Sequence, residues 1–337
     1  HFLLKAKLGK DLAAEYGQQW KLLVRLVREF VREAPLRKRI LHLCRHKFQM
    51  VLGAPILIPS RLLKRMLTIF LTQSGLDDPY RTLKRQMNRR TRNFVDSTFY
   101  SRLVNVCPEE RLSCSSITAL RFELDLLEME RLLFFSTYKR FWTEDNPTSS
   151  LDAEELRRSL EHVDFSPLRG LFNPERGPLR ILYLPRASGG IILDLKVVRA
   201  LLRQGHRVIM ALKEGFYFDS PTVWDLESDP ILASEFKDAF FMQNNRASKN
   251  ELLQATREHR LVVISDGTRE RFNPYRTSVT FARAWKESDL VLAKGEAYYR
   301  RFINTSHEFT RDLLVFFIDA QGKFRMYFKP KPAHVRK

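Results

Sequence analysis

Six short apolar runs in the second half of the sequence constrain the fold most strongly. Polar loops separate them, and several of the intervals between them have the apolar spacing of a helix, such as residues 191–204. Strands of a parallel sheet are buried on both faces and read as continuous apolar runs of this kind. We therefore predict an α/β fold with a Rossmann-like, doubly wound, mostly parallel sheet. The runs are residues 180–184, 207–212, 239–242, 261–264, 290–293 and 313–318.

The first half has a different pattern, because its apolar residues recur at helical spacing from about residue 10 to 145. Trp20, Leu23, Val24, Val27 and Val31 fall on one helix face, while the neighbouring arginines fall on another. We predict an all-helical domain over residues 1–150 and a short helix and linker over 151–178, with Ser150 as the cap of that helix. The α/β domain then covers 179–328, and a basic tail covers 329–337.

The strongly basic charge points to an anionic partner. The net charge is +19 and the isoelectric point is about 10.0, and roughly +12 of this charge falls in residues 1–150. One helix, residues 81–92, could contact nucleic acid along a phosphate backbone. The alternative is a solvated basic face, and the scarcity of aromatic residues there favours it. Its cations are Arg81, Lys84, Arg85, Arg89, Arg90 and Arg92.

Several classes of protein are excluded by missing patterns. Cys44, Cys107 and Cys114 match no even disulfide framework and no zinc-ligand spacing, so we expect reduced, structural thiols and a cytoplasmic protein. No stretch of 18 apolar residues predicts a membrane span. The sequence also lacks the Gly-x-Ser-x-Gly motif of serine hydrolases and the Gly-Lys-Ser/Thr phosphate-binding loop of Walker type. The sequence begins at His1 rather than at Met, so it predicts nothing about residues upstream of His1.

Polar loops follow four of the apolar runs, at the sheet edge where open parallel sheets bind ligands. The first loop contains Arg186, Ser188, Gly189 and Gly190 and leads into a helix, whose first amides and dipole favour phosphate. We predict these four residues to bind phosphate. A glycine-rich turn of this kind is also found without any ligand.

The other three loops add charged residues. Asp219 and Asp225 follow the second run, and their oxygens could hold a hard cation such as Mg²⁺. Asp266 and Gly267 follow the fourth run. Lys294 and Gly295 follow the fifth, where the lysine could hold a phosphate as a point charge. We predict phosphate binding at these last four residues, although loop carboxylates are often merely solvated.

Four segments together carry a resemblance to a known family. They are residues 181–194, 205–208, 265–268 and 289–295 followed by Tyr298 and Tyr299, and residues 78–88 match a helical segment further upstream. In this succession the sequence resembles the damage-control phosphatases, metal-dependent hydrolases of phosphorylated metabolites that were long known as a domain of unknown function. The resemblance implies a small phosphorylated metabolite as ligand and a divalent cation, Mg²⁺, Mn²⁺, Co²⁺ or Ni²⁺, as cofactor.

The sequence departs from this family where the metal should be bound. The family has Asp-Asn-Ala-Gly-Glu in the first loop, with the Asp and Asn at the metal, but here Arg186 and Ala187 take those two positions and Gly190 replaces the Glu. The second loop fits the family with one extra residue between Asp219 and Asp225. Near the phosphate, Tyr298 or Tyr299 replaces an Asn of the family.

Two functional hypotheses remain open from the sequence. In the first, the protein is a divergent phosphatase in which Asp219, with Asp225 or Asp266, holds a cation, and Asp219 and Lys294 are catalytic. In the second, the metal is lost and the protein is a catalytically inactive member of the family that binds phosphate through Arg186 and Lys294, or binds nucleic acid through its basic helical half. A single carboxylate binds a cation weakly, and Arg186 places a positive charge at the metal position, which favours the second. An interaction scaffold with neither property is a third alternative.

Overall fold

The computed structural model describes residues 10–53, 59–104, 118–145 and 153–333. The chain divides into two compact units, each with its own hydrophobic core. Unit 1 comprises residues 1–81 together with two short segments, 216–218 and 268–277, and unit 2 comprises the remaining residues. None of the described helices is both long enough and apolar enough to cross a membrane.

Unit 1 contains three helices that pack against one another, α1 (Lys10–Phe30), α2 (Ala34–Leu52) and α3 (Pro59–Ser74), together with the short turn η3 (Pro274–Arg276). Its core forms where their apolar faces meet, and Leu23, Ile40 and Phe70 are completely buried there. The apolar face expected for α1 is only partly in this core. Val27 and Val31 are buried, but Trp20 and Val24 remain half-exposed.

Cys44 lies in this core and is a free thiol. Its Sγ–H donates to the carbonyl of Met66 at 3.7 Å, and burial raises the pKa of the thiol to about 12. The thiol is therefore protonated at neutral pH and packs as a small apolar group. Cys107 and Cys114 lie outside the described residues.

Unit 2 begins with a series of helices and continues into the sheet. The helix expected at 151–162 is present as α8, while its expected cap, Ser150, lies outside the described residues. Before the sheet come α4 (Arg81–Val95), α5 (Thr98–Val104), α6 (Thr118–Thr137), α7 (Arg140–Thr143), α8 (Ala153–Glu161), α9 (Ser166–Phe172) and η2 (Pro174–Arg176).

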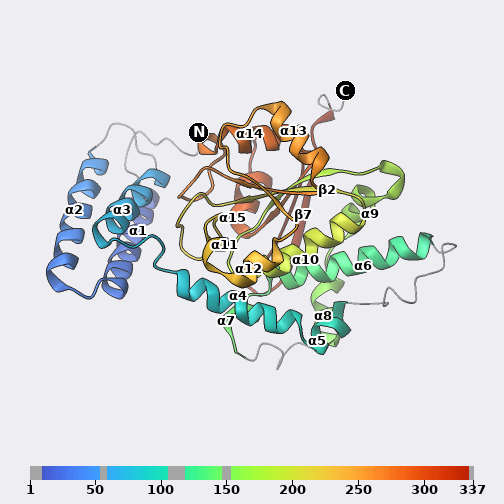
Figure 1. The fold of residues 1–337 in the computed structure, drawn as a ribbon, viewed down its shortest axis with the longest axis horizontal. Coiled ribbons are helices and arrows are strands. Elements are labelled where there is room, and N and C mark those ends of the chain that lie inside the picture. The colour runs from blue at the N-terminus through green and yellow to red at the C-terminus, as the bar shows by residue number, and fades with distance from the viewer. Residues whose placement is uncertain (1–9, 54–58, 105–117, 146–152, 334–337) are drawn as a thin grey trace. The chain divides into compact units, whose positions relative to one another are not determined.

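The sheet of unit 2 has seven strands in the order β3-β4-β2-β1-β5-β6-β7, parallel except for β7. The six apolar runs of the sequence are its six parallel strands, so that part of the α/β prediction is confirmed. Figure 1 shows α13 and α14 on one face of the sheet and α10 and α12 on the opposite face. The strands are β1 (Arg180–Leu184), β2 (Arg207–Leu212), β3 (Phe240–Met242), β4 (Leu261–Ser265), β5 (Leu290–Lys294), β6 (Asp312–Ile318) and β7 (Phe324–Lys329).

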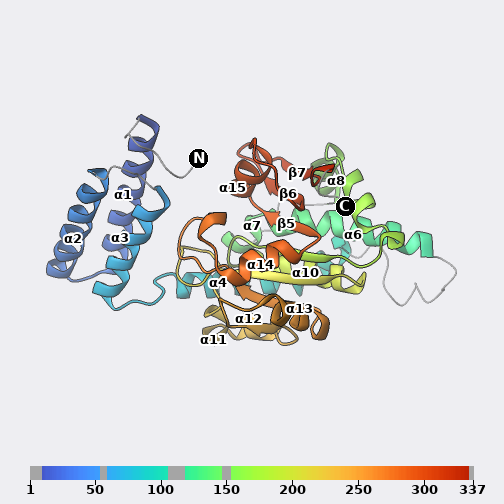
Figure 2. The same ribbon diagram turned by 90° about the horizontal axis from the view of Figure 1, so that it is seen from above.

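The helices of this part alternate with the strands, and the view in Figure 2 shows the same layers from above. The helix expected at 191–204 is α10, displaced by one residue. It packs against α6, which also contacts β6. The helices are α10 (Gly190–Arg203), α11 (Asp225–Ser228), α12 (Pro230–Glu235), α13 (Lys249–Glu258), α14 (Val279–Glu287), α15 (Glu296–Tyr298) and η4 (Tyr299–Ile303).

Strand β7 was not among the six runs. It pairs with β6 in antiparallel register, for example Val315 with Tyr327, at the edge of the sheet. Phe324 is buried and the other five residues are half-exposed, and the charged Arg325 and Lys329 keep the strand from reading as a continuous apolar run. Lys329, the first residue of the expected basic tail, is the last residue of this strand.

A buried histidine makes the stability of unit 2 dependent on pH. His206 is 3% exposed, its Nδ1 accepts the amide of Leu179 at 3.1 Å, and burial lowers its pKa from 6.5 to about 4. The unfolded chain therefore binds this proton more readily than the folded chain does. We therefore expect the free energy of unfolding to decrease by about 3 kcal/mol as the pH falls from 6.5 towards 4.

Urea unfolding measured from pH 7 to pH 4 tests this prediction. The difference in unfolding free energy between wild type and His206→Asn should shrink over that interval, because Asn can accept the Leu179 amide but does not titrate. A difference that stays constant with pH would show that His206 is not the group responsible.

Candidate functional site

The first loop carries its charge on Arg186, which is exposed and follows β1. The side chain of Arg186 lies against Gly295, directly after β5, so closely that a Cβ atom on Gly295 would lie 2.9 Å from Arg186 Cδ. Gly295 also has a φ of +124°, which L-residues rarely adopt. Glycine at 295 therefore leaves the space that the Arg186 side chain occupies at the carboxyl ends of β1 and β5.

Lys294, beside this arginine, is buried in an ion pair. Its Nζ donates to Asp194 Oδ2 at 2.6 Å and to the carbonyl of Ser136 at 3.1 Å, and the hydroxyl of Tyr183 donates to Asp194 Oδ1 at 2.7 Å. Burial raises the pKa of the Asp194 carboxyl and lowers the pKa of the Lys294 ammonium, although each charge stabilises the other. The ammonium predicted to hold phosphate is thus already neutralised inside the protein.

Burial and Asp194 have the largest effects on the pKa of Lys294. The charge of Arg186 lowers this pKa further, and the charge of Asp219 raises it. The three loops meet, because Arg186 lies against Gly295 beside Lys294 and the Ser188 amide donates to the Asp219 carbonyl, as the sequence predicts for the carboxyl ends of parallel strands. Asp219 is half-exposed, and its carboxylate makes no recorded hydrogen bond or ion pair with the described residues.

The two glycines of the first loop are covered by an aromatic ring. A Cβ atom on Gly189 would overlap the Cβ of Trp142, and one on Gly190 would lie 2.9 Å from Lys294 Nζ and 3.2 Å from the Trp142 ring. The Trp142 ring centroid is 5.9 Å from Lys294 Nζ. Replacement of the family's Glu by Gly190 therefore leaves room for the ammonium and the indole.

The backbone amides of this loop have partners within the protein. The Gly189 amide donates to Asn88 Oδ1 at 2.6 Å, and the Ser188 amide donates to the carbonyl of Asp219 at 2.7 Å. The hydroxyl of Ser188, in contrast, is completely buried and has no hydrogen-bond partner among the described residues. Phosphate binding by Ser188, Gly189 and Gly190 stays a prediction, and it would require the first two amides to exchange their present acceptors.

The second loop is held by α4. Lys84 Nζ lies 3.2 Å from Asp225 Oδ2, which also accepts the Thr222 amide at 2.8 Å, and both side chains of this ion pair are buried. Asn88, one turn further along α4, donates to Asp229 Oδ2 at 2.7 Å. The carboxylate predicted as the second metal ligand is thus engaged with a lysine.

The third loop is similarly engaged. Lys213 Nζ lies 2.6 Å from Asp266 Oδ2, and the Asp266 carbonyl accepts the Ser278 amide at 2.9 Å. Gly267 has a φ of +74°, and a Cβ there would lie 2.6 Å from Ser278 N. Close packing therefore accounts for glycine at 267 without any ligand, and phosphate binding by Asp266 and Gly267 remains a prediction.

The described residues do not fit a divalent cation at this edge of the sheet. No group of three or more His, Cys, Asp or Glu side chains among them is arranged to hold a metal ion. Asp225 and Asp266 each face a lysine, so Asp219 is the carboxylate left over, and hard cations need several oxygen ligands. A metal site at Asp219 and Asp225 therefore stays a prediction from the sequence.

The basic helix α4 has most of its cations paired. Lys84 faces Asp225, Arg90 lies 2.7 Å from Asp145, and Arg92 pairs with Asp96 and Glu235. Arg85 and Arg89 are exposed, with no ion pair recorded among the described residues. The contact with nucleic acid predicted for this helix is not supported by its side chains, since most of its cations are paired within the protein.

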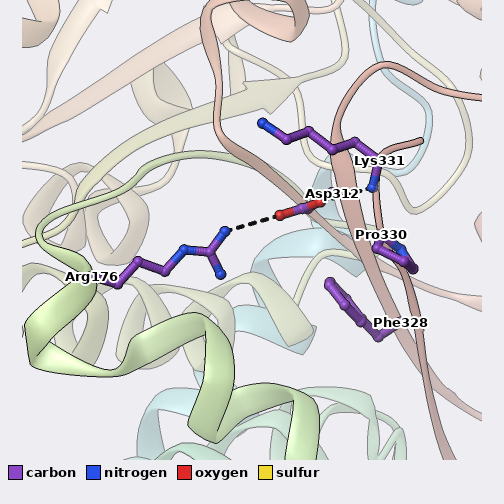
Figure 3. A pocket seen from close by; sticks show the side chains of 5 residues that line it. All are labelled: Arg176, Asp312, Phe328, Pro330 and Lys331. Carbon is purple, nitrogen blue, oxygen red and sulfur yellow. Dashed lines mark hydrogen bonds and ion pairs between the residues drawn. The ribbon is translucent and has the colours of Figure 1, made fainter. Parts of the chain in front are cut away.

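A cavity of about 400 Å³ in unit 2 lies away from these loops, at the start of β6 and the end of β7. Figure 3 shows Arg176 reaching Asp312, with Nη2 to Oδ2 at 3.3 Å, beside Phe328, Pro330 and Lys331. Asp312 also accepts the Lys331 amide at 2.8 Å. The carboxylate in the cavity is thus satisfied by its neighbours, and nothing in the chemistry links this cavity to the predicted phosphate loops.

Several residues of the site were not identified from the sequence. Trp142 and Asn88 belong to helical stretches read as core or as a basic face, and they act across long sequence separations. Tyr298 stacks on Phe302 and Tyr299 packs against Tyr327 at a tilt, so both contact neighbouring aromatic rings. A buried Asn amid charged residues is the one local signal that could have indicated Asn88.

Comparison with known proteins adds a family to this geometry. The model of the damage-control phosphatase ARMT1-like domain matches residues 8–320. The fold is similar to the crystal structure of a DUF89 family protein from Pyrococcus horikoshii, with a TM-score of 0.58 and 16% sequence identity over 95% of this chain and 98% of that one. At that identity the likeness shows a shared fold. The sequence has no match among curated proteins.

Proposed function

Because this chain belongs to the family of damage-control phosphatase ARMT1-like domains, we propose that it binds a small phosphorylated metabolite at the carboxyl ends of β1 and β5 without hydrolysing it through a metal. The observation that carries this proposal is the position of Arg186. Arg186 takes the sequence position at which the family resemblance places a metal-binding Asp, and its side chain lies in the space that Gly295 provides.

The sheet order supports the location. We interpret it as Rossmann-like, because the chain leaves β1 towards β2 on one side and later crosses back to β5 on the other. In open α/β sheets the ligand crevice lies at such a reversal, beyond the carboxyl ends of the two central strands. Arg186 follows one of these strands and Gly295 follows the other.

Arg186 has the chemistry that a phosphoryl group requires. A guanidinium presents several N–H donors in one plane and binds two phosphate oxygens at once. Lys294 is 4% exposed and is held by Asp194, so in this proposal it positions the loop from behind rather than contacting the ligand. Asp219 lies near both cations and would orient the hydroxyl groups of a sugar.

The residues do not favour hydrolysis as the activity. In the family the cation polarises the phosphoryl group and supplies a nucleophile, but of the three aspartates proposed to hold it here, Asp225 and Asp266 each pair with a lysine and Asp219 alone is left. We therefore propose a ligand-binding protein derived from a phosphatase. Cleavage by Asp219 and Lys294 remains the alternative from the sequence.

Calorimetric titration with ribose 5-phosphate in the presence of EDTA tests the proposal. We expect Arg186→Ala to weaken binding about 10- to 100-fold, the usual loss for a hydrogen bond between charged groups. Arg186→Lys should restore the charge but only part of the affinity. Arg260→Ala, which removes an exposed arginine at the start of β4, should leave binding unchanged.

A phosphatase assay provides the contrary outcome. Hydrolysis of p-nitrophenyl phosphate that is stimulated by Mg²⁺, Mn²⁺, Co²⁺ or Ni²⁺ and lost in Asp219→Ala would overturn the proposal in favour of catalysis. Equal binding by wild type and Arg186→Ala would remove Arg186 from the site.

A further inference from the structure

The positive charge of the protein is concentrated in unit 1. This unit contains less than a third of the chain but 19 Lys and Arg against 7 Asp and Glu, so it carries +12 of the net charge of +19. Such an excess raises the local concentration of polyanions and speeds their association. The charge therefore does not follow the predicted phosphate loops, all of which belong to unit 2.

One face of α1 presents this charge in a regular row. Lys21, Arg25 and Arg28 are spaced by four and three residues, which places them on the same side of the helix, and all three are exposed. No ion pair with another described residue is recorded for any of them. Their charges thus remain available, unlike most of those of α4.

The row of cations borders a hollow of about 600 Å³. Trp20 and Val24 line the hollow and are half-exposed, and Glu29 is its acidic member. The Trp20 ring packs against Phe48, with ring centroids 5.6 Å apart. An aromatic ring fixed in this way beside three free cations is the combination that single-stranded nucleic acids bind, because bases stack on the ring and phosphates pair with the cations.

We propose that this face of α1 binds a single strand of nucleic acid without sequence preference. Lys21, Arg25 and Arg28 contact successive phosphates, and a base enters the hollow and stacks against Trp20. Glu29 limits the charge at one end of the hollow. This binding surface is independent of Arg186 and of the metabolite proposed above.

An anionic membrane surface fits these residues less well. Helices that lie on membranes insert an apolar face among the lipids. The apolar face of α1 is occupied, since Leu23, Leu26 and Val27 are at most 1% exposed in the core of unit 1. What remains accessible is a cationic row with one aromatic ring in a hollow, which a flexible strand can enter and a lipid surface cannot.

Fluorescence anisotropy of the full chain with a labelled 20-nucleotide oligothymidylate tests the proposal at about 50 to 200 mM NaCl. Each phosphate contact on a single strand contributes about 0.7 to the slope of log Kd against log salt. Neutralising the row with Lys21→Gln, Arg25→Gln and Arg28→Gln should therefore reduce the slope by about 2 and weaken binding at least about tenfold at the low salt.

Trp20→Leu gives a second, distinct readout. It should weaken binding about 5- to 100-fold, the effect of losing one stacked base, while leaving the salt slope unchanged. The matched control is Lys237→Gln, Arg257→Gln and Lys286→Gln, which removes three exposed cations of unit 2 and should change neither quantity. Circular dichroism checks that the helices are retained in the triple variant. If that variant unfolds, each single Gln variant of the row should still lower the salt slope by about 0.7.

Several results would overturn the proposal. These are an absence of oligonucleotide binding at the low salt, an equal loss in the unit 2 control, or binding to phosphatidylserine vesicles but not to the oligonucleotide. Arg186→Ala should leave oligonucleotide binding unchanged, so failure of this proposal and failure of the metabolite proposal are separate outcomes.

Discussion

Asp194→Ala should lower the free energy of unfolding by about 3 to 5 kcal/mol, because it leaves the ammonium of Lys294 buried without its carboxylate. Asp194 is completely buried, and its two oxygens accept from Lys294 and from Tyr183. Removing it therefore takes one acceptor from each of these two buried donors, while Lys294 keeps the Ser136 carbonyl. Urea unfolding followed by circular dichroism measures the loss.

Replacing Tyr183, Asp194 and Lys294 together by apolar residues distinguishes the loss of the ion-pair partner from the loss of packing. Tyr183→Phe, Asp194→Leu and Lys294→Met together should recover most of the stability, since apolar groups of similar size often replace a buried ion pair at little cost. Arg157→Ala breaks an exposed ion pair and should change stability by no more than about 1 kcal/mol. A loss below about 1 kcal/mol for Asp194→Ala would contradict the burial of this pair.

Gly189→Ala should lower the free energy of unfolding by about 3 kcal/mol and displace the first loop, for two separate reasons. The backbone of Gly189 has φ of +77° and ψ of −63°, a conformation that is strained for alanine. The added Cβ would also overlap Trp142 and come 3.1 Å from Met87 Cβ. Thermal and urea unfolding measure the loss, and titration with ribose 5-phosphate reports the displaced loop.

The control for this variant is Gly170→Ala. Gly170 is an exposed residue of α9 with no atom within 4 Å of the added Cβ, so alanine there should be neutral or stabilise the protein by up to about 1 kcal/mol. Adding Trp142→Ala to Gly189→Ala should recover little of the loss, because alanine keeps the Cβ at 142 that the added atom would overlap and the backbone strain remains. Equal stability of Gly189→Ala and wild type would contradict the tight packing of the loop.

The strands of the sheet could be read from the sequence because burial on both faces leaves only apolar residues in each run. Strand β7 could not, because it lies at the edge of the sheet, where five of its six residues are half-exposed and two of them, Arg325 and Lys329, are charged. The boundaries of the expected helical and α/β domains stay a prediction. The structure shows that the positive charge is concentrated in unit 1. A division of the sequence at residue 150 does not separate this unit from the helices of unit 2.

The candidate site was predictable where it depends on strand ends and not where it depends on helices. Arg186, Asp219 and Lys294 come together because parallel strands end at one edge of the sheet. The partners that occupy them come from elsewhere in the chain. Asp225 is engaged by Lys84 across 141 residues, and Lys294 is engaged by Asp194 across 100 residues, and no local pattern carries such pairings.

The contact between Arg186 and Gly295 has a consequence for how such a site responds to its surroundings. A divalent cation must be acquired from solution and is lost to chelators, whereas a guanidinium is synthesised with the chain and stays charged at every pH at which proteins fold. Occupancy of this site would then depend on the ligand alone, including the ionisation of its phosphate near pH 6. The protein would report the supply of a metabolite without also reporting the supply of a metal.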